Sequence, residues 1–395
     1  MRETRISRSV AFRSGTLTAV LLLAAPGAMG GGLALAPLAA LGGLLAAPWP
    51  HLRRLALKAG WPLALLAAFV AWALISTLWS PDRRFHTPPR LAGGVATGLL
   101  LAAAFAWRPQ DPASALVRRA IVAFVALTAA IGVIEWCFGM PLNRIGHWGD
   151  PPSLLERAPM MGTAVLVLVM WSAIALLWRA GPKGYVAAAV LLAAALLSAM
   201  LSGMAASLVA VALGAAGFTA TLFLGPAMLR LAGYATAAWI VIAPFASPWF
   251  QTLFNPANTP DSWNERIAIW RATSAHILAH PWLGGGLGSF RPLSKALESP
   301  SGVIFQPVHP HSFALQVWFE LGIIGVALAA AALASFGRAA AKALADQPLA
   351  LAAATATLLA GAAISNLSYG AWEEWWIGAL FFAGGMAATV RRTSP

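Results

Sequence analysis

Charged residues are scarce in this sequence. Of 395 residues, 26 are Lys or Arg and 13 are Asp or Glu, so 10% are charged, against about 25% in a typical soluble domain. Hydrophobic residues make up 59% of the chain. A chain of this composition lacks the polar surface of a water-soluble fold, so we expect a protein that lies in a lipid bilayer.

Cysteine is almost absent, because Cys137 is the single one and lies in an apolar stretch. One cysteine excludes a disulfide framework and a metal site built from several thiolates. The formal net charge of +13 would indicate a polyanionic partner in a soluble protein. In a membrane protein the position of each cation matters more than the sum, and we expect no nucleic-acid partner.

Long apolar runs rich in Ala, Leu, Val and Gly make up most of the chain. Backbone polar groups in hydrocarbon must be satisfied within their own segment, so runs of about 20 apolar residues predict helices rather than barrel strands. We therefore predict an all-α integral membrane protein, a single polytopic domain over residues 1–395 with about twelve transmembrane helices. The predicted spans are 16–30, 31–47, 61–79, 91–107, 120–138, 158–178, 184–202, 205–225, 231–249, 312–334, 348–368 and 372–390.

The distribution of cations predicts the orientation. With a cytoplasmic N-terminus, 17 of the 26 Lys and Arg residues lie in inside segments and 9 in outside segments, so the positive-inside rule favours both termini in the cytoplasm. The alternative is that the first span is a signal peptide, because the arginines up to Arg13 precede an apolar run and Ala25-Pro26-Gly27-Ala28. We favour a retained hairpin, since the next apolar stretch follows at once.

The longest outside segment, residues 250–311, separates the ninth and tenth spans. Loops on a rigid membrane scaffold often carry binding and catalysis. Within it, Asn264 to Leu278 predicts an amphipathic helix that ends before Pro281 and the Gly284–Gly288 turn. This helix is expected to lie on the membrane surface or to cover the bundle. Its apolar face is formed by Ile267, Trp270, Ser274 and Ile277.

Histidines at the end of this loop are candidates for catalysis. His309 and His311 stand immediately before the tenth span, and a histidine at this water interface can act as a general base because its ordinary pKa is near neutrality. The alternative is a histidine that only caps the helix or binds a headgroup. Together with His276 and His280 they are candidate zinc ligands, but the loop has no cysteine and its carboxylates are scattered, so we expect no metal.

Arginines form a second candidate feature. Arg266 and Arg271 on the predicted loop helix, with Arg157 at the start of the sixth span, can form a cationic cluster that binds a lipid-linked diphosphate, since guanidinium groups bind phosphate oxygens in a bidentate manner. The alternative is contact with lipid headgroups. Glu320 and Glu135 lie inside predicted spans: we expect Glu320 to pair with an arginine or to have a polar structural role, and Glu135 to reach water.

Three motifs together resemble the O-antigen ligase and O-antigen polymerase superfamily. They are Arg266-x₃-Trp270, then His280-Pro281-Trp282-Leu283-Gly284-x-Gly286-Leu287-Gly288, then His309-Pro310-His311-Ser312-x₂-Leu315-Gln316-x₃-Glu320-Leu321-Gly322-x₂-Gly325. The family usually has Asn after the second histidine, where this chain has Ser312. Many members carry a Ser-Arg pair near 198–207, where this chain has Ser202-Gly203, and Arg157 is expected to supply that charge.

The resemblance implies a type C glycosyltransferase-like fold and a function. It implies an O-antigen ligase that transfers a glycan from undecaprenyl diphosphate to a sugar hydroxyl of lipid A-core, at the periplasmic face of the bacterial inner membrane, with inversion and without metal or cofactor. His311 would be the general base, with Arg266, Arg157, His309, Arg271 and Arg291 in substrate binding. The alternatives are an O-antigen or exopolysaccharide polymerase and, from another class, a lipid-linked glycan transporter.

Overall fold

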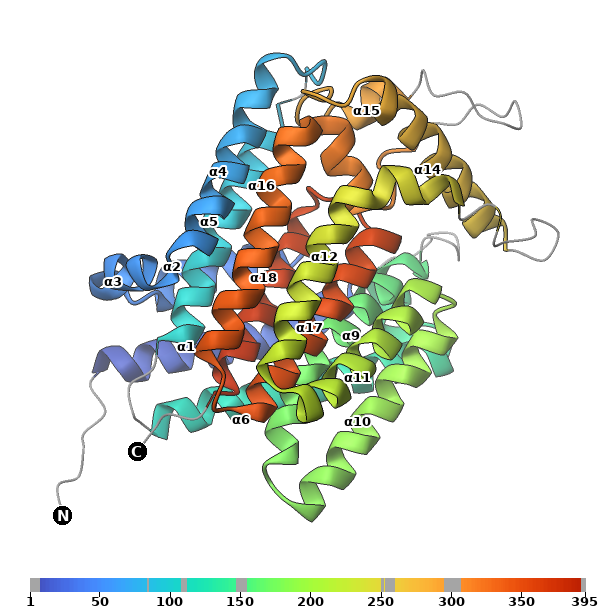
Figure 1. Cartoon of the computed structure of the whole chain (residues 1–395). Helices are drawn as coiled ribbons and strands as arrows, with labels where there is room; N and C mark the ends of the chain where they lie inside the picture. Colours follow the sequence, from blue (N-terminus) through green and yellow to red (C-terminus); the bar gives the residue numbers. More distant parts are fainter. Residues whose placement is uncertain are drawn as a thin grey trace.

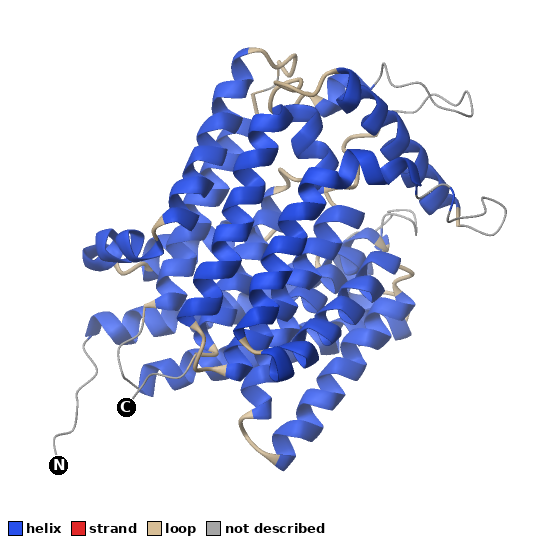
Figure 2. Cartoon of the chain, viewed as in Figure 1, coloured by secondary structure: helices blue, strands red, loops and turns tan. Residues whose placement is uncertain are grey.

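The computed structural model describes residues 8–83, 85–107, 112–146, 155–249, 252, 260–294 and 307–391. Parts of the predicted loop 250–311, namely 250–251, 253–259 and 295–306, lie outside the described residues. Within the described ranges the chain is helical and contains no strand (Figure 2). Ten helices are long and apolar enough to cross a membrane. The prediction of an all-α integral membrane protein is therefore confirmed.

The helices alternate in direction along most of the chain (Figure 1). They are α1 (Arg8–Met29), α2 (Leu35–Ala46), α3 (Leu52–Ala59), α4 (Trp61–Ile75), α5 (Thr87–Ala106), α6 (Pro112–Cys137), α7 (Pro141–Gly146), α9 (Arg157–Trp178), α10 (Pro182–Leu201), α11 (Ala205–Leu224), α12 (Pro226–Ala246), α14 (Asp261–Ala279), α15 (Phe290–Leu293), α16 (Phe313–Ala343), α17 (Pro348–Leu367) and α18 (Glu374–Thr389), with short 3-10 turns η1 (Trp49–His51), η2 (Ser76–Leu78) and η3 (Ser247–Trp249).

Two of the predicted spans are shorter than expected. The run 31–47 forms α2 with 12 residues, which bends by 79° into the segment Trp49–Ala59, and the run 372–390 forms α18 with 16 residues. At 1.5 Å per residue these helices are roughly 18 and 24 Å long, shorter than the roughly 30 Å hydrocarbon core. The run 31–47 is shortened at its start, because Gly31 and Gly32 form a turn with φ values of 103° and 70° before α2 begins at Leu35. The described residues contain ten candidate spans, or eleven if the bent pair forms one span, close to the predicted number of about twelve.

Helix α9 is the centre of the larger core. Sixteen of its 22 residues are buried, and it contacts α6, α10 and α17. A helix that is apolar on all sides is expected to be surrounded by other helices. A second core joins α4, α12, α14 and α16 with the segment around Trp372. This second core fixes the position of the predicted loop helix relative to the membrane helices.

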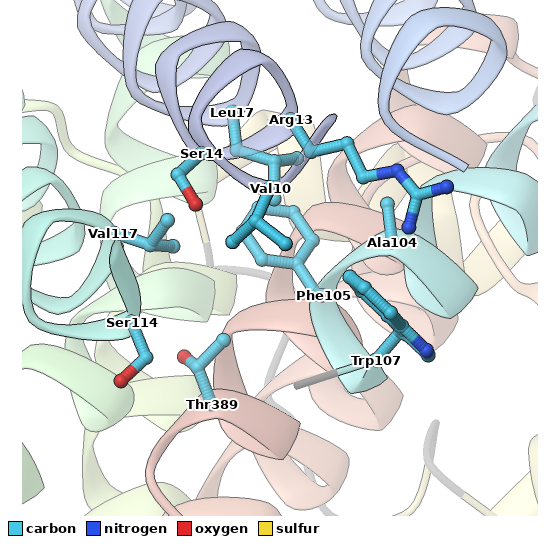
Figure 3. A pocket seen from close by; sticks show the side chains of 10 residues that line it. All are labelled: Val10, Arg13, Ser14, Leu17, Ala104, Phe105, Trp107, Ser114, Val117 and Thr389. Atoms are coloured by element: carbon cyan, nitrogen blue, oxygen red, sulfur yellow. The ribbon is translucent and has the colours of Figure 1, made fainter. Parts of the chain in front are cut away.

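The two ends of the bundle differ in chemistry. Helices α14 and α15 lie at one end, which we call the loop end (Figure 1). At the opposite end, the terminal end, the start of α1 meets the end of α18 around a small cavity of about 40 Å³. There the guanidinium carbon of Arg13 lies 4.4 Å from the centre of the Trp107 ring (Figure 3). The chain therefore brings its polar loop chemistry to one end and its first and last helices to the other.

Candidate active site

The predicted amphipathic helix is α14, and its expected apolar face is buried. Ile267 is 7% exposed, Trp270 2%, Ser274 0% and Ile277 1%. The Trp270 Nε1–H donates to the carbonyl oxygen of Pro310 at 2.9 Å. Helix α14 thus covers the loop end of the bundle and holds the segment that carries the two candidate histidines.

Helix α16, which begins just after this segment, is broken at one residue. Gly322 has a φ of 60° inside the helix, a left-handed conformation that glycine adopts without strain. The break frees helical carbonyl groups, and the Gly285 and Gly286 N–H groups donate to the carbonyls of Phe319 and Glu320 at 2.9 and 2.8 Å. The Gly284–Gly288 run is therefore a turn packed on α16, as its sequence context predicted.

Glu320 is the anchor of this turn. Its side chain is 1% exposed and accepts hydrogen bonds from the Gly288 N–H at 2.6 Å, the Phe290 N–H at 3.4 Å, the Gln316 amide at 3.1 Å and the Trp372 indole at 2.7 Å. All four partners are neutral donors. Of the two roles expected for Glu320, the polar structural role agrees with these contacts and pairing with an arginine does not.

Glu135 does not reach water, contrary to the expectation from sequence. It is fully buried and accepts hydrogen bonds from the Leu142 N–H at 2.8 Å and the Asn143 N–H at 3.2 Å. A carboxylate in this position satisfies the free N–H groups at the start of α7. The prediction was wrong because the chain turns back over the end of α6, which the hydropathy pattern does not record.

The two histidines of the motif are in contact with each other. The His311 N–H donates to His309 Nδ1 at 3.2 Å, and the rings are edge to face with centroids 4.3 Å apart. His311 has a φ of 52°, a conformation uncommon outside glycine that occurs where surrounding contacts enforce it. The backbone bond to His309 is one of these contacts, so His309 fixes the orientation of His311.

The Nδ1 atom of His311 lies 2.6 Å from the carbonyl oxygen of Ser368. A carbonyl can only accept a hydrogen bond, so Nδ1 carries the proton and Nε2 has the free lone pair. Burial and the neighbouring His309 and Arg266 lower the pKa of His311 to about 4, against the opposing effects of the Ser368 carbonyl and Glu373. At neutral pH the ring is uncharged and Nε2 can accept a proton.

Glu373 completes the histidine array, although the sequence analysis did not select it. Its Oε1 atom lies 3.2 Å from His309 Nε2 and accepts from the Gly370 N–H at 3.0 Å, while Oε2 accepts from the Trp375 indole at 2.6 Å. Burial raises the pKa of Glu373, but these partners outweigh it and hold the pKa below its ordinary value. Two carboxylates inside a Trp-rich apolar run were the signal that could have identified it.

Arg266 lies beside this array on α14. Its Nη1 atom donates to the Ser262 carbonyl at 2.9 Å, and its buried Nε atom has no hydrogen-bond partner among the described residues. Burial lowers the pKa of Arg266, while Glu265 and Tyr369 raise it. An arginine remains charged under such a shift, so a cation lies close enough to His311 to lower the pKa of that histidine.

The remaining predicted arginines have different positions. Arg157, Arg271 and Arg291 are exposed, and within the described ranges no hydrogen bond or ion pair joins them to the histidines. Arg157 is the first residue of α9, and the next residue, Ala158, packs against Gly31. The following Gly32 lies on the ring of Trp375, the indole that donates to Glu373. Packing contacts therefore connect the start of α9 with the segment that carries Glu373.

The histidines of α14 do not gather around a common centre with carboxylates. In the part of the chain that the structure describes, no group of three or more His, Cys, Asp or Glu side chains is placed to hold a metal ion. The His276 ring instead stacks on Phe319 with centroids 4.6 Å apart. His276 thereby contributes to the packing of α14 on α16.

Comparison with known sequences gives a match to part of the chain. Residues 152–330 match the sequence profile of the family described as O-antigen ligase. The matched segment extends from just before α9 into α16, and so includes Arg157, Arg266 and His311.

A relative in Rickettsia conorii is provisionally named a polysaccharide ligase. It is 26% identical over 278 residues, which cover 66% of this chain and 63% of the relative. The chain therefore spans less than two thirds of that relative's length.

Proposed function

We propose that this protein is an O-antigen ligase. It transfers a glycan from undecaprenyl diphosphate to a sugar hydroxyl of lipid A-core, with inversion at the anomeric carbon and without a metal. The observation that carries the proposal is the array at the loop end, in which His311 is held by Ser368 and His309 beside the partly unsatisfied cation Arg266. The match of residues 152–330 to the O-antigen ligase profile and the similarity to the polysaccharide ligase relative support the same activity.

In the proposed reaction the acceptor hydroxyl oxygen attacks the anomeric carbon as the bond to the diphosphate oxygen breaks. The electron pair of that bond leaves with undecaprenyl diphosphate, and the hydroxyl proton moves to His311 Nε2. A positioned base and a positioned donor are what this reaction requires, because a diphosphate is a good leaving group once its charge is balanced. His309 and Glu373 act as positioning residues, since they hold the backbone and ring of His311.

Arg266 is assigned to the diphosphate. Its buried Nε–H is a donor that bound substrate would satisfy, and an ionised hydrogen bond of this kind is stronger than a neutral one. The positive charge of Arg266 lowers the pKa of His311. The negative charge of a bound diphosphate would offset it. Donor binding would therefore make His311 a stronger base at the time it is needed.

Arg157 is proposed as the second cation for the diphosphate, because α9 begins near the Trp375–Glu373 contact. Arg271 and Arg291 are assigned to outer parts of the glycan or to lipid headgroups, which agrees with their exposure. The loop end is proposed to face the periplasm of the bacterial inner membrane, with both termini in the cytoplasm, as the positive-inside rule predicts.

Lipopolysaccharide from a deletion strain tests the proposal. A ligase mutant is expected to lack all O-antigen on lipid A-core and to accumulate long glycan on the carrier lipid. Complementation with the wild-type gene should restore the ladder of bands on a gel. If the mutant instead shows core bearing a single repeat unit, the protein is a polymerase, and an unchanged ladder would contradict both activities.

A further inference from the structure

A crevice of about 630 Å³ runs between α12, α16, α17 and α18. Its volume is within the range of about 300–1,000 Å³ for ligand sites. The crevice separates α16 from α17, two helices that follow each other in the chain. We call this space the α16–α17 crevice. Residues that define its extent are Phe313, Phe336, Leu344, Asn366, Gly384 and Arg391.

The two ends of the crevice are marked by Asn366 and Arg391, and a few hydroxyl groups, those of Thr236, Thr357 and Ser365, line the space between them. At the loop end, Asn366 accepts hydrogen bonds from the Ala314 N–H at 3.0 Å and the Ser312 hydroxyl at 3.4 Å. At the terminal end lies the exposed Arg391. The wall between them is mostly Ala, Leu, Gly and Phe. Such a lining favours a hydrocarbon chain over any polar ligand.

The depth of the crevice matches the bilayer. Its lining extends from Phe313 and Asn366 at the loop end to Ala343 and Arg391 at the terminal end, so it runs between the two ends of helices that cross the roughly 30 Å hydrocarbon core of a membrane. A chain in the crevice would therefore be covered by protein through most of the membrane. A short acyl tail would fill only part of this length.

The loop end of the crevice is next to the candidate active site. Phe313 and Asn366 line the crevice and lie two positions from His311 and from Ser368, which are hydrogen bonded to each other. A lipid whose hydrocarbon chain entered here would place its head group at the histidine array. The head group would then be within the part of the loop end that contains Arg266.

The crevice has space that a side chain can fill without moving the backbone. A Cβ atom added at Gly384 would meet no heavy atom within 4 Å. Phe336 is 47% exposed and Leu380 39% exposed, so the wall is not sealed by its own side chains. A larger residue at position 384 would therefore occupy the crevice itself.

We propose that the α16–α17 crevice binds the isoprenoid chain of the lipid-linked donor. The inference rests on the proposed function, because a diphosphate head group at Arg266 sets where the chain enters. The occupant is the long, methyl-branched chain of isoprene units rather than a shorter phospholipid acyl chain, since the crevice extends through the bilayer from the reaction site. The crevice would thereby select donors by the length of their lipid.

The test compares glycan donors that carry an undecaprenyl or a geranyl chain, using full-length protein in proteoliposomes. Gly384→Leu removes space for several methylene groups, so kcat/KM for the undecaprenyl donor is expected to fall by about tenfold or more, with the geranyl donor unaffected. Gly93→Leu on α5 is the matched control, because Gly93 is also an exposed helical glycine with no atom within 4 Å of its added Cβ. Equal loss with both donors, or no loss with either, would overturn the proposal.

Photolabelling separates this proposal from the proposed function. Undecaprenyl diphosphate with a diazirine at the end of its chain should label peptides of α16, α17 and α18 in the wild-type protein, and much less in Gly384→Leu. Labelling of the same peptides by a diazirine phosphatidylethanolamine, without competition from undecaprenyl diphosphate, would overturn the proposal. If labelling succeeds but neither donor is turned over, the crevice assignment stands and the transferase assignment fails.

Discussion

Replacing Glu320 by glutamine tests whether this buried carboxylate holds the loop end together. Each oxygen of Glu320 accepts two hydrogen bonds: Oε1 from Phe290 and Gln316, and Oε2 from Gly288 and Trp372. A glutamine has one oxygen and one NH₂ group. In either orientation the NH₂ group faces two N–H donors, so two buried donors lose their acceptor.

The magnitude follows from the number of donors left without a partner. A buried donor without an acceptor costs about 1–3 kcal/mol, so Glu320→Gln should destabilise the local structure by about 2–6 kcal/mol. Hydrogen exchange of the Gly284–Gly288 backbone amides should then accelerate by at least about thirtyfold, because about 1.4 kcal/mol corresponds to a factor of ten. Mass spectrometry of peptic peptides measures this change.

Glu374→Gln is the matched control for this experiment. Glu374 is 40% exposed and its carboxylate lies 2.7 Å from Arg90, which is 55% exposed. An exposed ion pair contributes about 0–1 kcal/mol, so exchange in the Gly284–Gly288 segment should remain at the wild-type rate. Wild-type exchange in Glu320→Gln would refute the assignment of Glu320 as the anchor of the turn.

Three further predictions concern the site. The reaction requires the uncharged form of His311, whose pKa is about 4. The value of kcat/KM should therefore stay constant from neutral pH to about pH 5 and fall only at lower pH. A decline near pH 6.5, about the ordinary pKa of histidine, would contradict this. Glu373→Ala should lower kcat by about tenfold or more with little change in KM. Glu373→Gln should retain activity, because its amide oxygen can still accept a hydrogen bond from His309. A fully active alanine variant would exclude a positioning role. Arg266→Lys should raise KM for the donor by about tenfold, while Arg271→Lys should not; equal effects would contradict the assignment.

Local patterns in the sequence were sufficient to predict the helices and the loop helix. The face of α14 follows from helical spacing of Ile267, Trp270, Ser274 and Ile277, and all four are buried. The lengths of α2 and α18 were predicted less well. Hydropathy averages over a window, so the predicted span 31–47 includes the glycine turn that precedes Leu35 and gives no sign of the 79° bend after α2.

The partners of the candidate base could not be predicted from local patterns. Ser368 is 57 positions from His311, and Glu373 lies beyond another complete helix. Their contact with the histidines depends on how α17 returns to the loop end, which spacing along one helix does not determine. The role of Glu320 has the same origin, since its four donors come from three separate segments of the chain.

The most direct test of the proposed transferase uses purified protein, a glycan linked to undecaprenyl diphosphate and lipid A-core as the acceptor, in the presence of a metal chelator. The wild-type protein is predicted to form the linked product, and His311→Ala to lower kcat by about 100-fold or more while still binding the donor. Full transfer by His311→Ala would contradict the assignment of His311 as the general base.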